Sequence, residues 1–231
     1  MKYYVIAGEP SGDLHASNFI RELKVLDPSA DFYFLGGDLM EAVANRKPTI
    51  HIREMAFMGF VDVAKNLGKI KQNFKTVKQD IEAQKPDVVI LVDYPGFNLR
   101  MAKWAKEKGY KVFFYISPTV WAWKEGRVET IKKYVDRMFV ILPFEKPFYK
   151  KHNYDVSFVG HPLLDAIEQK KKTMLSEQEF IKQNNLSDKP IIAVLPGSRK
   201  QEINYMFDTM LAIMNDFKEY QFVIGGTHNL P

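Results

Sequence analysis

Residues 87–98 read Asp87-Val-Val-Ile-Leu-Val-Asp93-Tyr-Pro-Gly-Phe-Asn98, and this stretch decides the fold. It contains five consecutive aliphatic residues, Val88 to Val92, most of which are β-branched. Such a run is typical of a strand that is covered on both faces, as in a parallel sheet. We therefore predict that these five residues form a central strand of an α/β domain.

Asp93 follows at the carboxyl end of this strand, where open α/β sheets bind their ligands. The Tyr94-Pro95-Gly96 turn then leads the chain away from the sheet. A carboxylate in that position is a candidate general base. The alternative is that Asp93 caps a helix starting near Phe97, and the residues alone leave both interpretations open.

Apolar, strand-like segments alternate with segments of helical spacing on both sides of this stretch. The predicted strands cover residues 3–7, 31–35, 110–116, 137–142 and 156–159, and the predicted helices cover residues 14–26, 39–43 and 99–108. This alternation predicts a doubly wound, largely parallel sheet over residues 1–163. The lysine-rich residues 164–189 are predicted to be a domain crossing, and residues 190–231 the incomplete start of a second, Rossmann-like domain.

The composition indicates a globular protein with anionic partners. The chain has 231 residues, 46% of them hydrophobic, no cysteine and a net charge of +5. The positive charge favours phosphates, nucleotides or acidic lipid surfaces as partners. No apolar run reaches the ~20 residues that span a bilayer, and no signal-peptide pattern opens the chain. We expect a cytosolic or peripherally membrane-bound protein.

Two loops that follow predicted strands are candidate binding sites. Gly8 and Gly12 allow a ligand to approach the backbone, while Ser11 and Asp13 can cap the next helix; the alternative is a purely structural turn. Neither the dinucleotide fingerprint nor a P-loop is present. The second loop follows the predicted strand over residues 110–116 and brings aromatic rings and cations together. The alternative is that its tryptophans only fill the edge of the sheet. Its candidate residues are Trp121, Trp123 and Arg127.

The later loops have weaker candidates. His161 lies at another predicted strand end, where a structural histidine is the alternative. In residues 196–199 a glycine permits close approach and Arg199 can neutralise a diphosphate, although an exposed arginine at a turn is the bland interpretation. Residues 55–61 adjoin a lysine-rich segment, which is either an amphipathic helix packed on the sheet or a membrane contact.

Six segments together resemble the lipid-A-disaccharide synthases, which are inverting glycosyltransferases of outer-membrane lipid biosynthesis. They occur in the family's order over nearly the whole chain. They are Ala7-Gly-Glu-Pro-Ser-Gly-Asp-Leu-His15, Val92-Asp-Tyr-Pro-Gly-Phe-Asn98, Ser117-Pro-Thr-Val-Trp-Ala-Trp-Lys124, Pro143-Phe-Glu145, Val159-Gly-His-Pro-Leu163 and Leu195-Pro-Gly-Ser-Arg199. One departure is Gly96, which stands where the family commonly has a second aspartate.

The resemblance implies a GT-B-like fold and a transfer reaction. A UDP-activated diacylglucosamine would donate its sugar to diacylglucosamine 1-phosphate, with Asp93 as the base. The implied acceptor-binding residues are Gly8, Ser11, Gly12, Asp13, Trp121, Trp123 and Arg127. The implied donor-binding residues are His161, Gly197, Ser198 and Arg199. The implied membrane-contact residues are Met55, Phe57, Met58 and Phe60.

The resemblance also implies a cytoplasmic protein that is peripheral on the inner membrane of a Gram-negative-type bacterium. No cofactor and no nucleic acid are expected. No metal is expected either, because the sequence lacks an Asp-x-Asp pair that would chelate one. A homo-oligomer is left open. Two other functions remain. One is an acceptor-lipid-binding remnant without catalysis, and the other is a nucleotide-sugar epimerase on a similar fold.

Overall fold

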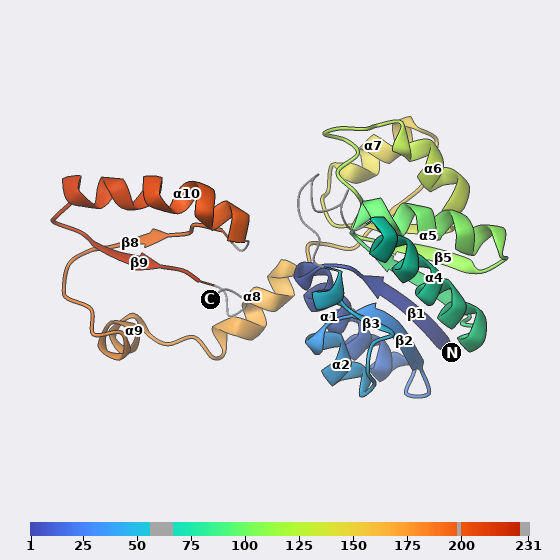
Figure 1. Cartoon of the computed structure of the whole chain (residues 1–231), viewed down its shortest axis with the longest axis horizontal. Helices are drawn as coiled ribbons and strands as arrows, with labels where there is room; N and C mark the ends of the chain where they lie inside the picture. Colours follow the sequence, from blue (N-terminus) through green and yellow to red (C-terminus); the bar gives the residue numbers. More distant parts are fainter. Residues whose placement is uncertain (56–66, 198–199, 227–231) are drawn as a thin grey trace. The chain divides into compact units, whose positions relative to one another are not determined.

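A computed structural model describes residues 1–55, 67–197 and 200–226 (Figure 1). The chain divides into two compact units, Met1–Ile167 and Glu168–Pro231. The division falls inside residues 164–189, the segment for which the sequence predicts a domain crossing. The roles assigned to the two domains stay predictions.

The first unit is built on a parallel sheet, which in the described residues has seven strands in the order β3-β2-β1-β4-β5-β6-β7. The predicted central strand is β4, and it lies in the middle of this order. Its neighbours pair with it in register, Ala7 with Val92 and Val92 with Tyr115. The strands are β1 Lys2–Ala7, β2 Asp31–Gly36, β3 Ile50–His51, β4 Val88–Val92, β5 Lys111–Tyr115, β6 Arg137–Val140 and β7 Ser157–Phe158.

Helices cover both faces of the sheet (Figure 1). On one face, Tyr3 and Val5 of β1 pack with α1 (Pro10–Leu26) and α2 (Asp38–Ala44). On the other face, Tyr4 and Ile6 share a core with a second set of helices. These are α4 Leu67–Gln84, α5 Pro95–Glu107, α6 Arg127–Tyr134 and α7 Glu145–Lys151. Side chains alternate along a strand, so the unbroken apolar runs of β1 and β4 bury both faces, as their sequence predicts.

Some helix boundaries differ from those that apolar spacing predicts. Both α1 and α5 start at a proline, several residues before the first periodic apolar residue. A proline suits the first helical turn because its missing N–H has no partner there. The sequence prediction missed α6, which buries only Val128 and Ile131 and therefore has little apolar signal.

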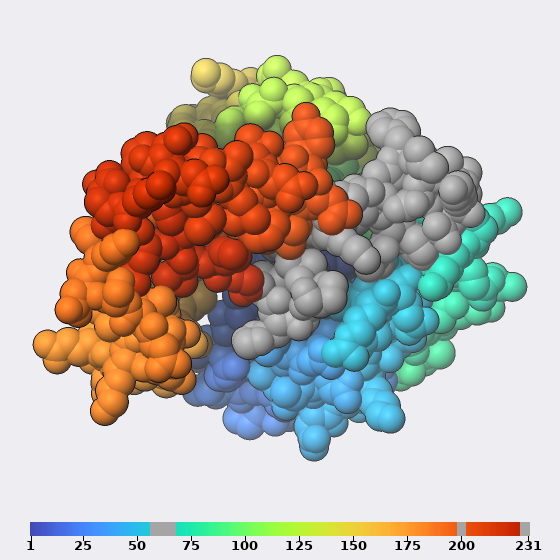
Figure 2. Space-filling view, turned by 60° about the vertical axis from the view of Figure 1, so that its left-hand side comes forward, coloured from blue at the N-terminus to red at the C-terminus, as the bar shows by residue number. Residues whose placement is uncertain are grey.

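The second unit contains β8 (Ile191–Val194) and β9 (Gln221–Ile224), which pair in parallel. Between these strands the chain forms α10 (Lys200–Ala212), followed by a short 3-10 turn, η2 (Ile213–Asp216). The boundary between the two units falls within α8 (Leu163–Lys171), and neither this helix nor α9 (Glu177–Gln183) buries any of its residues. Both α9 and α10 lie at the surface of this unit, in the orange and red parts of Figure 2.

Candidate active site

The carboxyl ends of β1, β4 and β5 lie side by side and carry the residues of the first three motifs. The register places Ala7, Val92 and Tyr115 level with one another. The backbone N–H of Asp93 continues this ladder by donating to the Tyr115 carbonyl oxygen, at 3.0 Å. Parallel pairing therefore brings the glycine loop, Asp93 and the start of the tryptophan loop to one edge of the sheet.

Asp93 does not cap α5. The N-cap residue of that helix is Tyr94, and no side chain bonds to the helix N-terminus from the cap position. The carbonyl oxygen of Tyr94 instead accepts from the N–H groups of Phe97 and Asn98, at 3.2 and 3.0 Å. The carboxyl group of Asp93 is thus left for another role.

A buried amide holds the backbone around Asp93. Asn98 is fully buried, and its Nδ2 donates toward the carbonyl oxygens of Asp93, Val92 and Ile6, at 2.7, 3.2 and 3.3 Å. This one side chain therefore ties the ends of β1 and β4 to the turn. The sequence analysis quoted Asn98 within a motif without giving it a role.

Burial is the main cause that raises the pKa of Asp93, to about 6. The Glu9 carboxylate raises it further, and the backbone N–H of Tyr94 opposes the rise. A carboxyl group with a pKa near 6 is ionised at neutral pH and is a stronger base than an exposed aspartate. Burial also raises the pKa of the Tyr94 hydroxyl, and the negative charge of Glu9 is the second, smaller cause. Glu9 was not among the predicted site residues, and its only signal in the sequence is its place beside Gly8 in the first loop.

The glycines of the first loop fit close packing. A Cβ on Gly8 would lie 2.2 Å from the Tyr94 ring, and one on Gly12 would lie 3.3 Å from the Ala7 Cβ. Ser11 is exposed. Gly8 therefore allows the β1 loop to lie directly against the turn that carries Asp93.

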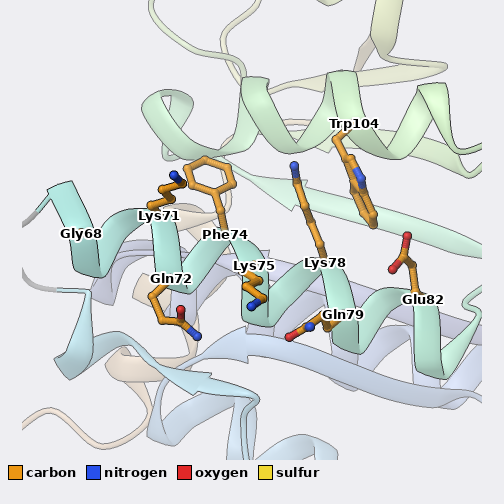
Figure 3. Close-up of a pocket in the computed structure, with 9 residues that line it drawn as sticks. All are labelled: Gly68, Lys71, Gln72, Phe74, Lys75, Lys78, Gln79, Glu82 and Trp104. Atoms are coloured by element: carbon orange, nitrogen blue, oxygen red, sulfur yellow. The ribbon is translucent and has the colours of Figure 1, made fainter.

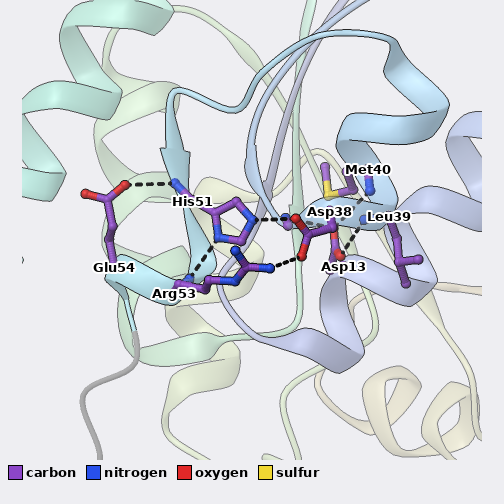
Figure 4. A network of polar contacts seen from close by, with 8 residues as sticks. Asp13, Asp38, Leu39, Met40, His51, Arg53 and Glu54 are labelled. Carbon is purple, nitrogen blue, oxygen red and sulfur yellow. Dashed lines mark hydrogen bonds and ion pairs between the residues drawn. The ribbon is translucent and has the colours of Figure 1, made fainter. Parts of the chain in front are cut away.

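Asp13 has a structural role that its sequence position did not reveal. Its carboxylate is buried and accepts from the backbone N–H groups of Gly37, Leu39 and Met40, at 2.8, 3.1 and 3.1 Å (Figure 4). It thus caps α2 rather than its own helix, because a buried carboxylate needs several donors. Its acceptor-binding role stays a prediction.

The same view shows a second, exposed set of contacts that belongs to the scaffold. Asp38, in the first turn of α2, lies 2.6 Å from Arg53 Nη2 and 3.3 Å from His51 Nε2 (Figure 4). His51 also accepts from the Arg53 backbone N–H, at 3.1 Å. These contacts join α2 to the segment that follows β3.

The tryptophan loop presents its rings to solvent. The side chains of Trp121 and Trp123 are 40% and 56% exposed. The Trp121 ring meets Phe144 edge to face, with centroids 4.8 Å apart. Lys124 Nζ and Arg127 Cζ lie 4.3 and 5.5 Å from the centroid of Trp123. Rings this exposed do not plug the sheet edge, and they remain free to contact a ligand.

His161 lies within electrostatic reach of two buried groups. It opposes the rise in the pKa of Glu145 that burial causes, and it adds to the lowering of the pKa of His15 by burial. Glu145 accepts from the N–H groups of Ile141 and Leu142, at 3.1 and 2.8 Å. The Pro143-Phe-Glu145 motif therefore includes a buried turn-forming carboxylate, whose position the sequence did not reveal.

The predicted membrane and donor residues are only partly described. Met55 is 3% exposed and belongs to the core, so its expected contact with lipid is wrong. Phe57, Met58 and Phe60 lie outside the described residues, as do Ser198 and Arg199. Gly197 has a φ of 117°, a conformation that favours glycine, and its Cβ would meet the Glu202 side chain at 2.6 Å.

A basic groove lies along α4 and α5, apart from the residues of the sheet edge (Figure 3). Its volume is about 610 Å³. Lys78 reaches toward Trp104, with its Nζ 5.3 Å from the ring centroid. The lining residues are Gly68, Lys71, Gln72, Phe74, Lys75, Lys78, Gln79, Glu82 and Trp104.

The described residues contain neither a membrane-spanning helix nor a cluster of metal-binding side chains. None of their helices combines the length and the apolar character that crossing a bilayer requires. They also contain no group of three or more histidine, aspartate or glutamate side chains that could hold a metal ion. Metal independence stays a prediction.

The sequence matches one family over nearly its whole length. Residues 3–226 fit the profile of lipid-A-disaccharide synthetase. This chain belongs to that family. A lipid-A-disaccharide synthase of Coxiella burnetii strain Dugway is 42% identical over 98% of the chain, and one of Geobacter metallireducens is 44% identical over 90%. The chain spans 60% and 53% of the lengths of these two relatives.

Solved structures confirm the predicted GT-B-like α/β fold of this synthetase-family chain. A UDP-GlcNAc 2-epimerase from Neisseria meningitidis, bound to UDP-GlcNAc, has a TM-score of 0.67 at 14% identity, covering 99% of this chain and 67% of its own. A structure described as a putative UDP-N-acetylglucosamine 2-epimerase from Listeria monocytogenes has a TM-score of 0.69 at 14% identity, and the match covers 99% of this chain and 63% of that one. At such identities the likeness shows the fold alone, so the epimerase alternative has less support than membership of the synthetase family.

Proposed function

We propose that this chain forms the acceptor side of a glycosyltransferase of lipid A biosynthesis. The donor is UDP-2,3-diacylglucosamine, the acceptor is 2,3-diacylglucosamine 1-phosphate, and the products are the disaccharide 1-phosphate and UDP. Family membership supports the reaction. The observation that carries the proposal is the partly buried Asp93 carboxyl group, with its pKa of about 6, at the carboxyl end of the central strand.

Asp93 acts as the general base of a single displacement. Its carboxylate accepts the proton of the acceptor hydroxyl while that oxygen attacks the anomeric carbon of the donor sugar. The bond from this carbon to the diphosphate oxygen breaks on the opposite side, so the configuration inverts and UDP leaves with the electron pair. Asn98 holds the backbone of the base in place through the contacts described above.

The remaining binding roles are also part of the proposal. Gly8, Gly12 and Ser11 form the wall of the acceptor site beside Asp93, and the indoles of Trp121 and Trp123 contact the acceptor together with Arg127. Glycines at positions 8 and 12 keep this wall close to the sheet edge. Gly197, Ser198 and Arg199 bind the donor diphosphate, and His161 is assigned to the donor as well.

The first prediction concerns the base. In an enzyme that carries the donor domain, Asp93→Asn lowers kcat by about 100-fold or more, because the amide cannot accept the proton. The fold is kept, since burial already disfavours the charged carboxylate. Asp87→Asn is the matched control, because Asp87 is exposed and precedes the opposite end of the same strand. Turnover of Asp93→Asn near the wild-type value would refute the assignment of the base.

The same assay separates the alternatives. Both lipid substrates are supplied to this chain and to a version extended by a complete donor domain. Product formed only by the longer form supports the acceptor-side proposal, and no product from either form favours an acceptor-lipid-binding protein without catalysis. A change in the stereochemistry of the donor sugar without transfer indicates an epimerase.

Contact with the cytoplasmic face of the inner membrane is a further part of the proposal. The basic groove on α4 supports it, because cations attract acidic lipid headgroups. Phe57, Met58 and Phe60 are proposed to reach the acyl chains from the neighbouring segment. Replacing these three by serine should reduce liposome binding, and undiminished binding would argue against their contact with lipid.

A further inference from the structure

Trp123 and its two cations form a patch at the end of β5. Lys124 has a left-handed backbone angle, φ 58°, which is uncommon for a residue with a side chain. Its ammonium group and the Arg127 guanidinium group both lie over the exposed Trp123 ring, at 4.3 and 5.5 Å from the centroid. The loop thus holds two positive charges against one open aromatic surface.

The acidic neighbours of this patch each contact another side chain. Glu125 Oε1 lies 2.9 Å from His152 Nε2, and Glu129 Oε1 lies 3.5 Å from Lys132 Nζ. Within the part of the chain that the structure describes, neither Lys124 nor Arg127 has a carboxylate partner. In the described part of the chain their charges thus form no ion pair, and they favour an anion.

The chemistry of the patch suits a phosphorylated sugar. An indole face packs against the apolar face of a sugar ring, and an ammonium and a guanidinium group together bind a phosphate monoester strongly. The loop that carries the patch begins beside Asp93, because the N–H of Asp93 bonds to the last residue of β5. A neutral sugar would use the indole but would leave both cations without an anionic partner.

We propose that Trp123, Lys124 and Arg127 form the binding site for the phosphate end of the acceptor, a phosphorylated glucosamine lipid. This deepens and rests on the proposed function, since it assigns one end of the proposed acceptor to one loop. The acceptor hydroxyl then lies toward Asp93, and Lys124 becomes a specificity-determining residue that the sequence analysis did not include.

The test measures binding to this chain, without catalysis. The probe is a water-soluble diacylglucosamine 1-phosphate with six-carbon acyl chains, and the comparison ligand is the same lipid without phosphate. Dissociation constants are measured by calorimetry, and tryptophan fluorescence reports on the loop. Lys124→Gln and Arg127→Gln should each weaken binding of the phosphorylated probe by about tenfold, because each removes a charge-assisted contact. Neither should change binding of the unphosphorylated lipid.

Lys133→Gln is the matched control. Lys133 lies on the same helix as Arg127, also faces an aromatic ring, Tyr134 at 5.4 Å, and its replacement removes the same charge. The control should bind the probe as the wild type does. Circular dichroism establishes that each variant is folded.

Three results would overturn the inference. The first is that the wild type does not bind the phosphorylated probe, and the second is that the wild type binds both ligands with equal affinity. The third is that Lys124→Gln and Arg127→Gln weaken binding to anionic vesicles but leave binding of the soluble probe unchanged. The last result would make the patch a membrane contact. Failure of the proposed function can be told apart from failure of this inference. An active Asp93→Asn enzyme would refute Asp93 as the base, but the affinity for the probe would still depend on Lys124.

Discussion

Asp93 and Tyr94 are consecutive residues with left-handed backbone angles, φ 46° and 48°. Each such residue costs about 1–2 kcal/mol when it carries a side chain. The net contribution of one hydrogen bond is about 1 kcal/mol, so the Asn98 contacts are of the size needed to offset this strain. At the scale of single residues, the turn exists because one buried amide spans two strand ends and the carbonyl of Asp93.

The second prediction concerns this amide. Asn98→Ala should lower the free energy of unfolding by about 1–3 kcal/mol, because buried carbonyl groups lose their donor. Asn98→Asp has nearly the same shape but replaces the donor with an acceptor, and it should be at least as destabilising. Urea unfolding followed by circular dichroism measures both. A tolerated Asn98→Asp at neutral pH would mean that the shape of residue 98 matters and its donor does not.

The third prediction is the pH dependence of the base. In an enzyme that carries the donor domain, kcat/KM should rise as pH increases through about 6, because only the ionised Asp93 accepts a proton. Glu9→Gln removes a negative charge that raises the pKa of Asp93, so the midpoint should move to lower pH.

Glu22→Gln serves as the control for Glu9→Gln. Glu22 is exposed on α1, the helix that follows Glu9, and the variant removes the same charge. Its midpoint should equal that of the wild type. A midpoint that is unchanged in Glu9→Gln as well would show that Glu9 does not act on the base.

At the scale of elements, α4 has two different sides. Val77 and Ile81 pack into the core, and Asp80 accepts from the hydroxyl groups of Tyr4 and Thr49. The opposite side contributes lysines to the basic groove, against Trp104 of α5 (Figure 3). The interpretation of this segment as an amphipathic helix packed on the sheet is therefore confirmed, and its lysine face is left for an anionic partner.

The fourth prediction tests that face. Replacing Lys71, Lys75 and Lys78 together by glutamine should lower the affinity for anionic vesicles by roughly tenfold or more, because each cation near an acidic membrane contributes about 1 kcal/mol. Cosedimentation with vesicles at low salt measures the affinity. The control replaces Lys170, Lys171 and Lys172, which changes the net charge equally in α8 and the residue after it. Equal losses in the two variants would indicate net charge rather than the groove.

At the scale of the whole molecule, the chain consists of two units that meet within α8. Residues 168–175 are exposed, and none of the α8 residues is buried. Exposed segments between compact units are preferred sites of proteolysis.

The fifth prediction follows from this division. Limited trypsin digestion should cut first after Lys170, Lys171 or Lys172 and release the first unit as a stable fragment. Mass spectrometry of the early products identifies the site. If trypsin instead cut first after a lysine of α5 or β5, the first unit would open more readily than the exposed residues 168–175.

The first motifs illustrate what could be predicted. The apolar run of β4 predicts a central parallel strand because local periodicity reports burial on each face, and the carboxyl end of such a strand is a ligand edge. The same reasoning could not separate capping from catalysis for Asp93, nor find Glu9. The first question depends on where α5 begins, and the second on which strand lies beside β4, which is β1, far away in the sequence.

The sequence by itself determined the alternation of strands and helices, the family and the place of Asp93 at a strand end, because these follow from local patterns and motif order. Only the tertiary structure decided that Asp13 caps α2, that Met55 is buried, and that Asn98 and Glu9 act on Asp93. Hydrogen bonds, burial and charge effects act through space over a few ångströms. The partners of a side chain are therefore known only once the distant strands have paired.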